Sequence, residues 1–164
     1  MIEFCVRKAT RRDSAGFLKL IVDLANFEHL EPPSLAARRR ILADLFSKKI
    51  VRLFVAVDKK AGHVGYALYF FTYSSFLARP TLYLEDIFVA EDHRKRGIGK
   101  ALFMECVREA KRNGCGRMEW AVLTWNENAI KFYENLGAKR LDQWYYYRLN
   151  SDSLETLSSP RPGS

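Results

Sequence analysis

The sequence lacks several features that would assign the chain to a common class of protein. No apolar run approaches the ~18–20 residues that a membrane-spanning helix needs. The start, Met1-Ile2-Glu3-Phe4, alternates like a strand and does not read as a secretory leader. We therefore expect a cytoplasmic protein without a membrane association. There is no internal repeat and no interdomain linker, so the 164 residues suggest one domain.

Cysteine is also scarce. The three cysteines, Cys5, Cys106 and Cys115, do not have the spacing of metal ligands. Cys106 falls on the apolar stripe of a predicted helix, as a structural thiol does. We expect free thiols and no metal site.

Two common nucleotide-binding motifs are absent as well. The P-loop needs a glycine where Arg94 stands and a serine or threonine where Ala101 stands. The dinucleotide motif G-x-G-x-x-G fails because Leu102 occupies its third glycine position.

What the sequence does contain is a basic, glycine-bearing turn between a strand pattern at 81–89 and a helix pattern at 97–112. Its members are Arg94, Lys95, Arg96, Gly97, Ile98, Gly99 and Lys100. Free N–H groups and the positive end of the helix dipole favour an anion there, and glycine lets a phosphate approach the backbone. The alternative is an ordinary basic helix start.

Hydrophobic periodicity predicts the remaining elements. Strands are expected at 2–8, 51–58, 63–73, 81–89, 117–123 and 139–149. Helices are expected from about 10 or 13 to 31, from 34 to about 46, at 97–112 and at 126–136. The order β-α-α-β-β-β-α-β-α-β predicts one α/β (α+β) domain over residues 1–149. Residues 150–164, rich in Ser and Pro, are expected to form a disordered tail.

Two adjacent acids, Glu85 and Asp86, interrupt the apolar strand at 81–89. Side chains alternate along a strand, so the two are expected to point to opposite faces. Such departures from local rules concentrate at functional sites. The alternative is a pair of structural acids bonded to the backbone or to arginine.

Two motifs resemble those of the GNAT N-acetyltransferases. Arg94-x-x-Gly97-x-Gly99 is similar to the acetyl-CoA pyrophosphate loop, and Asn126-x-x-Ala129-x-x-Phe132-Tyr133 is similar to a second signature near the cofactor sulfur. The resemblance covers residues 2–149 and implies a mixed, mostly antiparallel sheet of about six strands flanked by about four helices. It implies acetyl-CoA as cosubstrate and a homodimer. The cofactor residues expected are Ile87, Phe88, Val89, Arg94, Lys95, Arg96, Gly97, Ile98, Gly99, Lys100, Asn126, Ala129, Phe132 and Tyr133.

A closer resemblance is to the diamine (spermidine/spermine) and thialysine acetyltransferase branch, through Ala25-Asn26-Phe27-Glu28, Phe70–Tyr73 and Leu82–Val89. It implies Glu85 as a base acting through water and Tyr133 as an acid. Its acceptor site is expected to contain Phe27, Glu28, Glu85, Asp86 and Asp142. The chain departs from this branch at Ser74-Ser75, where polyamine enzymes carry Asp-Pro, so long polyamines are expected to be poorer acceptors.

The proposed reaction needs a base for a physical reason. An alkylamine has a pKa of ~10.4, so roughly one molecule in 2,500 is the neutral nucleophile at pH 7. A desolvated carboxylate such as Glu85 can take the proton, and Tyr133 can protonate the departing thiolate. Backbone N–H groups at 87–89 can polarise the thioester carbonyl.

The net charge of +8 leaves other functions open. Phosphates of CoA and nucleic acid are both anionic partners. The basic residues are scattered over different elements, which makes a nucleic-acid-binding module the weaker interpretation. A protein-lysine acetyltransferase, or a module that binds CoA or nucleic acid without turnover, remains an alternative to a small-amine enzyme.

Overall fold

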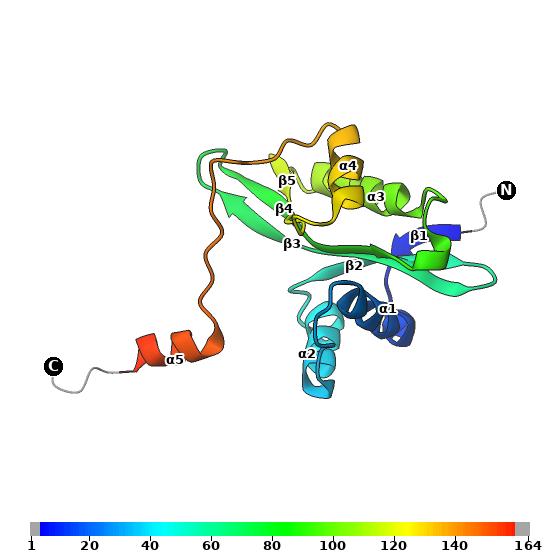
Figure 1. Cartoon of the computed structure of the whole chain (residues 1–164), viewed down its shortest axis with the longest axis horizontal. Helices are drawn as coiled ribbons and strands as arrows, with labels where there is room; N and C mark the ends of the chain where they lie inside the picture. The colour runs from blue at the N-terminus through cyan, green and yellow to red at the C-terminus, as the bar shows by residue number, and fades with distance from the viewer. Residues whose placement is uncertain (1–3, 160–164) are drawn as a thin grey trace. The chain divides into compact units, whose positions relative to one another are not determined.

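The computed structural model describes residues 4–159, which group into two units that divide after Ala121. The first unit holds a sheet in the order β1-β2-β3-β4-β5 (Figure 1). Its strands are β1 (Phe4–Lys8), β2 (Arg52–Asp58), β3 (Gly62–Ser74), β4 (Arg79–Val89) and β5 (Arg117–Glu119). All neighbours are antiparallel except β4 and β5, which are parallel. This confirms the predicted α/β class with a mixed, mostly antiparallel sheet.

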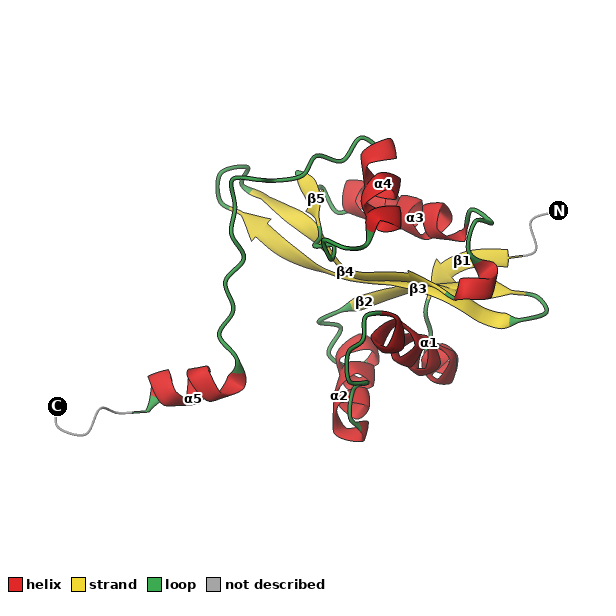
Figure 2. Cartoon of the chain, viewed as in Figure 1, coloured by secondary structure: helices red, strands yellow, loops and turns green. Residues whose placement is uncertain are grey.

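Helices cover both faces of this sheet (Figure 2). One face carries α1 (Ser14–Phe27) and α2 (Leu35–Phe46), and the other carries α3 (Ile98–Arg112). Single turns of 3-10 helix precede α1 at Arg11–Asp13 and α3 at Glu91–His93. The second unit holds α4 (Glu127–Asn135) and α5 (Ser151–Ser158). No helix within residues 4–159 combines the length and apolarity needed to cross a membrane.

The central strands are buried on both faces, which is why they read as nearly continuous apolar runs. On the side of α1 and α2, alternate residues of β2 and β3 join a core of Phe17, Leu20, Leu45, Leu53, Val55, Tyr66, Leu68 and Phe88. On the other side, α3 buries Leu102, Phe103 and Cys106. Cys106 is fully buried, as its place on the apolar stripe predicted.

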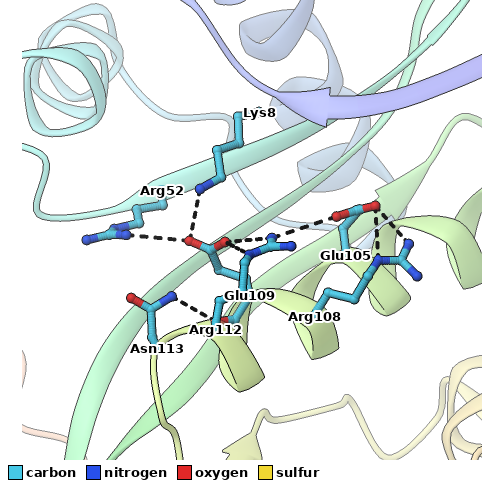
Figure 3. A network of polar contacts seen from close by, with 7 residues as sticks. All are labelled: Lys8, Arg52, Glu105, Arg108, Glu109, Arg112 and Asn113. Carbon is cyan, nitrogen blue, oxygen red and sulfur yellow. Dashed lines mark hydrogen bonds and ion pairs between the residues drawn. The ribbon is translucent and has the colours of Figure 1, made fainter.

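An ionic network attaches the C-terminal half of α3 to the sheet (Figure 3). The Glu109 carboxylate is almost fully buried and accepts from Lys8 Nζ at 3.1 Å and from Arg112 Nη2 at 2.8 Å. The Arg52 guanidinium lies 3.5 Å from the same carboxylate. Burial acts to raise the pKa of Glu109, but the bonds from Arg112 and Lys8 outweigh it and hold that pKa below its usual value.

The predicted strand at 139–149 is wrong. These residues are exposed and contain no strand, and Trp144, Tyr145, Tyr146 and Tyr147 are 75–90% exposed. Aromatic residues favour strands only where a neighbouring strand and a covering layer receive them. The edge strand of the described sheet, β5, has only three residues, although residues 117–123 were predicted to form it. So short an edge offers little for an eleven-residue strand to pair with.

The C-terminal segment also differs from expectation. The tail predicted to be disordered contains α5, whose first turn is capped by the Asn150 side chain accepting from Ser153 N at 2.9 Å. Since α5 buries no residue, local capping and not packing forms it. Residues 160–164 of that prediction, and residues 2–3 of the predicted first strand, lie outside the described residues. The single domain over residues 1–149 stays a prediction.

A buried cluster at the start of α1 generates a stability test. His63 Nε2 lies 2.8 Å from Asp13 Oδ1, and Arg7 contacts the same carboxylate at 2.8 Å. A Cβ built on Gly16 would overlap the His63 ring. We expect Gly16→Ala to destabilise the protein by ~1–3 kcal/mol, because His63 must leave Asp13.

The control is the same change in a His63→Ala background. With the ring gone, Gly16→Ala should stabilise by ~0.5–1 kcal/mol, since alanine is the better helix former. Urea unfolding of all four proteins measures both effects. Equal effects in the two backgrounds would contradict the assigned clash.

Candidate active site

The two acids predicted from the sequence lie at a β-bulge in β4. Leu68 of β3 pairs with Asp86, whereas Tyr69 pairs with Leu84, so Glu85 has no residue opposite it. A bulge bends the strand and re-aims its side chains. Glu85 is exposed, and Asp86 is partly buried on the face that carries α1.

The structure therefore changes the ranking of these two carboxylates. The sequence predicted that Glu85 is the desolvated carboxylate, but the structure shows that Asp86 is the more buried of the two. Burial, followed by the negative charges of Glu85 and Glu28, raises the pKa of Asp86 to about 7. Glu28, the residue that ends α1, is also partly buried, and burial raises its pKa. Glu28, Glu85 and Asp86 thus lie near enough to influence one another.

The sequence analysis did not identify Tyr66, whose hydroxyl donates to Asp86 Oδ2 at 3.4 Å. The signal was available in principle. An antiparallel pairing of 63–73 with 81–89 predicts that some residue of β3 lies beside each acid of β4. The register that selects Tyr66 depends on the bulge, and the bulge has no local sequence signature.

Beside these acids, β4 has an open edge. β5 pairs only with Thr81, Leu82 and Tyr83, so residues 84–89 have no strand on that side within the described chain. Every second N–H and C=O of a strand points to a given side. Backbone groups in this stretch, which includes the predicted cofactor residues Ile87, Phe88 and Val89, therefore have no strand partner on that side, although the Val89 carbonyl accepts from Arg94.

The basic turn follows directly and begins α3. Gly97 is the N-cap of α3 and has a φ of 80°, in the left-handed region that glycine adopts without strain. No side chain caps this helix, and its first intrahelical bond runs from Ala101 N to Gly97 O. The earlier N–H groups therefore have no intrahelical acceptor. Ile98 is buried and anchors the turn.

The four predicted basic residues of this turn do not behave alike. Lys95, Arg96 and Lys100 are exposed and leave the turn positively charged. The Arg94 side chain instead makes contacts within the protein. Its Nε donates to Val89 O at 3.1 Å, and its guanidinium lies over the rings of Phe27 and Phe88, 4.7 and 5.7 Å from their centroids. Arg94 thus connects the turn to the end of α1.

The remaining predicted site residues lie in the second unit. Asn126 caps α4 by accepting from Ala129 N at 3.2 Å. Tyr133 is buried, and its ring meets that of Phe132 edge to face. Asp142, predicted to bind the acceptor, is exposed and paired with Arg140. The approach of Tyr133 or Asp142 to the β4 carboxylates stays a prediction.

The residues of the first unit fit acetyl-CoA. The left-handed Gly97, the uncapped start of α3 and the exposed Lys95, Arg96 and Lys100 suit a pyrophosphate. The open edge of β4 suits the amide groups of the pantetheine arm. The acids on the same strand suit a cationic acceptor, because opposite charges attract most strongly where solvent is partly excluded.

The chain is similar to known proteins over most of its length. The acetyltransferase (GNAT) family model matches residues 18–138. The thialysine N-epsilon-acetyltransferase of Sus scrofa is 30% identical over 96% of this chain and 99% of its own length. The L-ornithine N5-acetyltransferase of Arabidopsis thaliana is 44% identical over 57% of this chain, a match that spans only 41% of that relative.

Solved structures agree with the fold. An integron cassette protein from the mobile metagenome of V. cholerae superposes with a TM-score of 0.82 at 22% identity, covering 98% of this chain and 100% of its own. The family match covers most of the chain and includes both the β4 bulge and the basic turn. The chain therefore belongs to the GNAT family of acetyltransferases.

Proposed function

We propose that this enzyme transfers an acetyl group from acetyl-CoA to a primary amine of a small cationic acceptor, such as a lysine- or thialysine-like amino acid or a short diamine. The observation that carries the proposal is a group of three carboxylates: Glu85 and Asp86 on β4, the strand with the open edge, and Glu28, whose charge acts on Asp86. Full-length similarity to a thialysine acetyltransferase supports the acceptor class. A homodimer and a cytoplasmic location remain predictions.

Chemistry at the acceptor begins with a proton. Holding an alkylamine neutral at pH 7 is worth about 4–5 kcal/mol, given a pKa of ~10.4. A carboxylate on β4 removes that proton. Family resemblance favours Glu85, acting through water, and Asp86 lies beside it. Either group is on a strand whose position is fixed by the sheet, so the geometry does not depend on a loop.

The rest of the reaction uses backbone and phenol groups. Acetyl-CoA, when bound, supplies an acetyl thioester. Backbone N–H groups of 87–89 then stabilise negative charge on its carbonyl oxygen, as an oxyanion hole does. The Tyr133 hydroxyl donates a proton to sulfur as the C–S bond breaks. Asn126, Ala129 and Phe132, on or at the start of the same helix α4, contact the cofactor in this proposal.

A panel of amines tests the proposed function. We expect CoA release with lysine, thialysine, ornithine and short diamines to exceed release with spermine, measured as kcat/KM. The physical reason is that Ser74 replaces an acid that would hold a distal ammonium. Ser74 is buried and its hydroxyl accepts from Leu77 N at 3.3 Å, so it is committed to the β3–β4 turn.

Two outcomes of this panel would contradict the proposal. Spermine with the highest kcat/KM would overturn the ranking. Activity confined to basic peptides would replace the small amine by protein lysine.

Cofactor binding at the turn is tested with Gly97→Asp. The change adds a negative charge at the helix start and a Cβ at a φ of 80°. We expect calorimetry to show CoA affinity lowered by about tenfold or more, or ~1.4 kcal/mol. Gly114→Asp is a matched control. Gly114 also has a positive φ, 65°, and open space around it, but it follows the other end of α3. Equal losses in both variants would mean that strain, not charge, weakens binding.

The proton donor is tested with Tyr133→Phe. A general acid typically contributes ~10²–10⁴-fold in rate, so kcat should fall by that factor while CoA affinity is kept. High pH should not restore activity, because a leaving thiolate gains nothing from fewer protons. Tyr145→Phe, which alters an exposed tyrosine of the same unit, should match wild type. A loss of less than about threefold in Tyr133→Phe would place the acid elsewhere.

A further inference from the structure

The buried Tyr66 on β3 and the partly buried Asp86 on β4 form a hydroxyl–carboxylate pair in which Tyr66 has no role assigned so far. Tyr66 is completely buried, and its hydroxyl donates to Asp86 Oδ2 at 3.4 Å. Phe17 of α1 packs edge-on against the tyrosine ring with centroids 5.1 Å apart, and Phe88 lies at 6.3 Å. The ring is thereby held on two sides, so the hydroxyl has a fixed position.

Strand register explains why this hydroxyl meets Asp86 and not Glu85. Tyr66 pairs with Phe88, and Leu68 pairs with Asp86. Tyr66 and Asp86 are therefore diagonal neighbours on the face that carries α1. Glu85, at the bulge, has no residue opposite it and is exposed. Only one of the two adjacent acids is both partly buried and held by a neighbouring side chain.

Charged groups around Asp86 come from three elements. Glu85 on the same strand and Glu28 at the end of α1 are negative, and both oppose a second negative charge on Asp86. The Arg94 guanidinium lies over the rings of Phe27 and Phe88, near the same end of α1. Burial and the two acids raise the pKa of Asp86, whereas the bond from Tyr66 lowers it. Tyr66 thus favours the charged, proton-accepting form.

We propose that Asp86 is the carboxylate that removes the proton from the acceptor amine, and that Tyr66 is the positioning residue that holds Asp86 for this step. The inference rests on the proposed function, which leaves the choice between Glu85 and Asp86 open. Glu85, being exposed, attracts the cationic acceptor to the site. A partly dehydrated base with a restrained side chain is the better proton acceptor, because less solvent must rearrange as its charge changes.

The proton count of the step is complete. The acceptor ammonium loses one proton to Asp86, which passes it to solvent, and the neutral nitrogen forms its bond to the acetyl carbon. As the C–S bond breaks, sulfur gains a proton from Tyr133, and the second proton that nitrogen loses passes through solvent to restore the Tyr133 hydroxyl. The products are the N-acetylated amine, CoA thiol and one released proton.

The first test compares pH profiles of kcat/KM for four variants, with CoA release in the absence of amine subtracted. Asp86→Asn should lose ~10²-fold or more at pH 7 and recover toward pH 10, the pKa of the amine itself. Glu85→Gln should retain an acidic limb, moved to lower pH because the loss of a neighbouring negative charge lowers the pKa of Asp86, and should raise KM for the cationic acceptor. Tyr66→Phe keeps the ring and removes only the hydroxyl, whose hydrogen bond lowers the pKa of Asp86. The acidic limb of the kcat/KM profile should therefore move to higher pH, and the plateau value of kcat/KM should fall by less than about tenfold.

Tyr69→Phe is the matched control. Tyr69 is also a buried tyrosine of β3, but it stacks on Phe54 and its hydroxyl is directed to Glu109. The Tyr69→Phe change removes a buried tyrosine hydroxyl that does not contact Asp86. The acidic limb of its pH profile should therefore coincide with that of wild type. If Tyr69→Phe shifts the limb as Tyr66→Phe does, the effect is a general loss of packing and the positioning role is wrong.

The second test needs no turnover. Carbon-13 NMR of protein labelled at the aspartate carboxyl groups should show one aspartate that titrates near pH 7. Its signal should be missing from Asp86→Asn and should titrate at higher pH in Tyr66→Phe. Circular dichroism confirms that each variant is folded.

Two results would overturn the inference. One is a set of aspartates that all titrate below about pH 5, near their ordinary range. The other is a Glu85→Gln variant that loses the acidic limb while Asp86→Asn keeps it, which would return the proton transfer to Glu85. Wild-type protein whose CoA release is no faster with any amine than without amine would instead refute the proposed function, and the NMR titration would still decide whether Tyr66 holds Asp86.

Discussion

The pairing of β3 with β4 is the constraint on which the site depends. β4 is bonded to β3 along nearly its whole length, yet β5 accompanies it only at Thr81, Leu82 and Tyr83. One edge of β4 is therefore fixed and the other is free over residues 84–89. The fixed edge sets the direction of Asp86 through the bulge, and the free edge offers backbone groups to a ligand. A strand bonded equally on both sides could not do both.

Charge is separated along the same stretch of chain. The acids occupy the middle of β4, and the exposed Lys95, Arg96 and Lys100 follow its end. Arg94 lies between the two groups, with its guanidinium on Phe27 and Phe88. It therefore lies between a region that favours cations and one that favours anions, and its own side chain is partly buried. The overall charge of +8 conceals this local division.

Elements with strong periodicity could be predicted from the sequence. The stripe of Leu102, Phe103 and Cys106 gave α3, and Gly97 and Gly114 marked its ends. Features set by contacts between distant residues could not be predicted. The bulge at Glu85 depends on how two strands align, so sequence reasoning assigned burial to the wrong member of an adjacent pair. Tyr66 was passed over for the same reason.

The wrong prediction of a strand at 139–149 has a related cause. Its aromatic residues have strand propensity, but propensity does not supply a neighbour, and the segment is exposed. The helix at Ser151–Ser158 shows the opposite case, in which one capping side chain, Asn150, suffices to begin an element that buries nothing. Neither the absence of the strand nor the presence of this helix can be predicted from amino-acid composition alone.

The buried Glu109 carboxylate has a consequence at the far end of its helix. Lys8 and Arg52 bind it from β1 and β2, so α3 is joined to the sheet near its C-terminus. Ile98, buried at the first turn, holds the other end. A helix held at both ends resists sliding and tilting, so the N–H groups near Gly97 keep a fixed position. For the proposed phosphate contact at Gly97, little free energy would then be consumed in ordering the protein, because the helix dipole already points at the site.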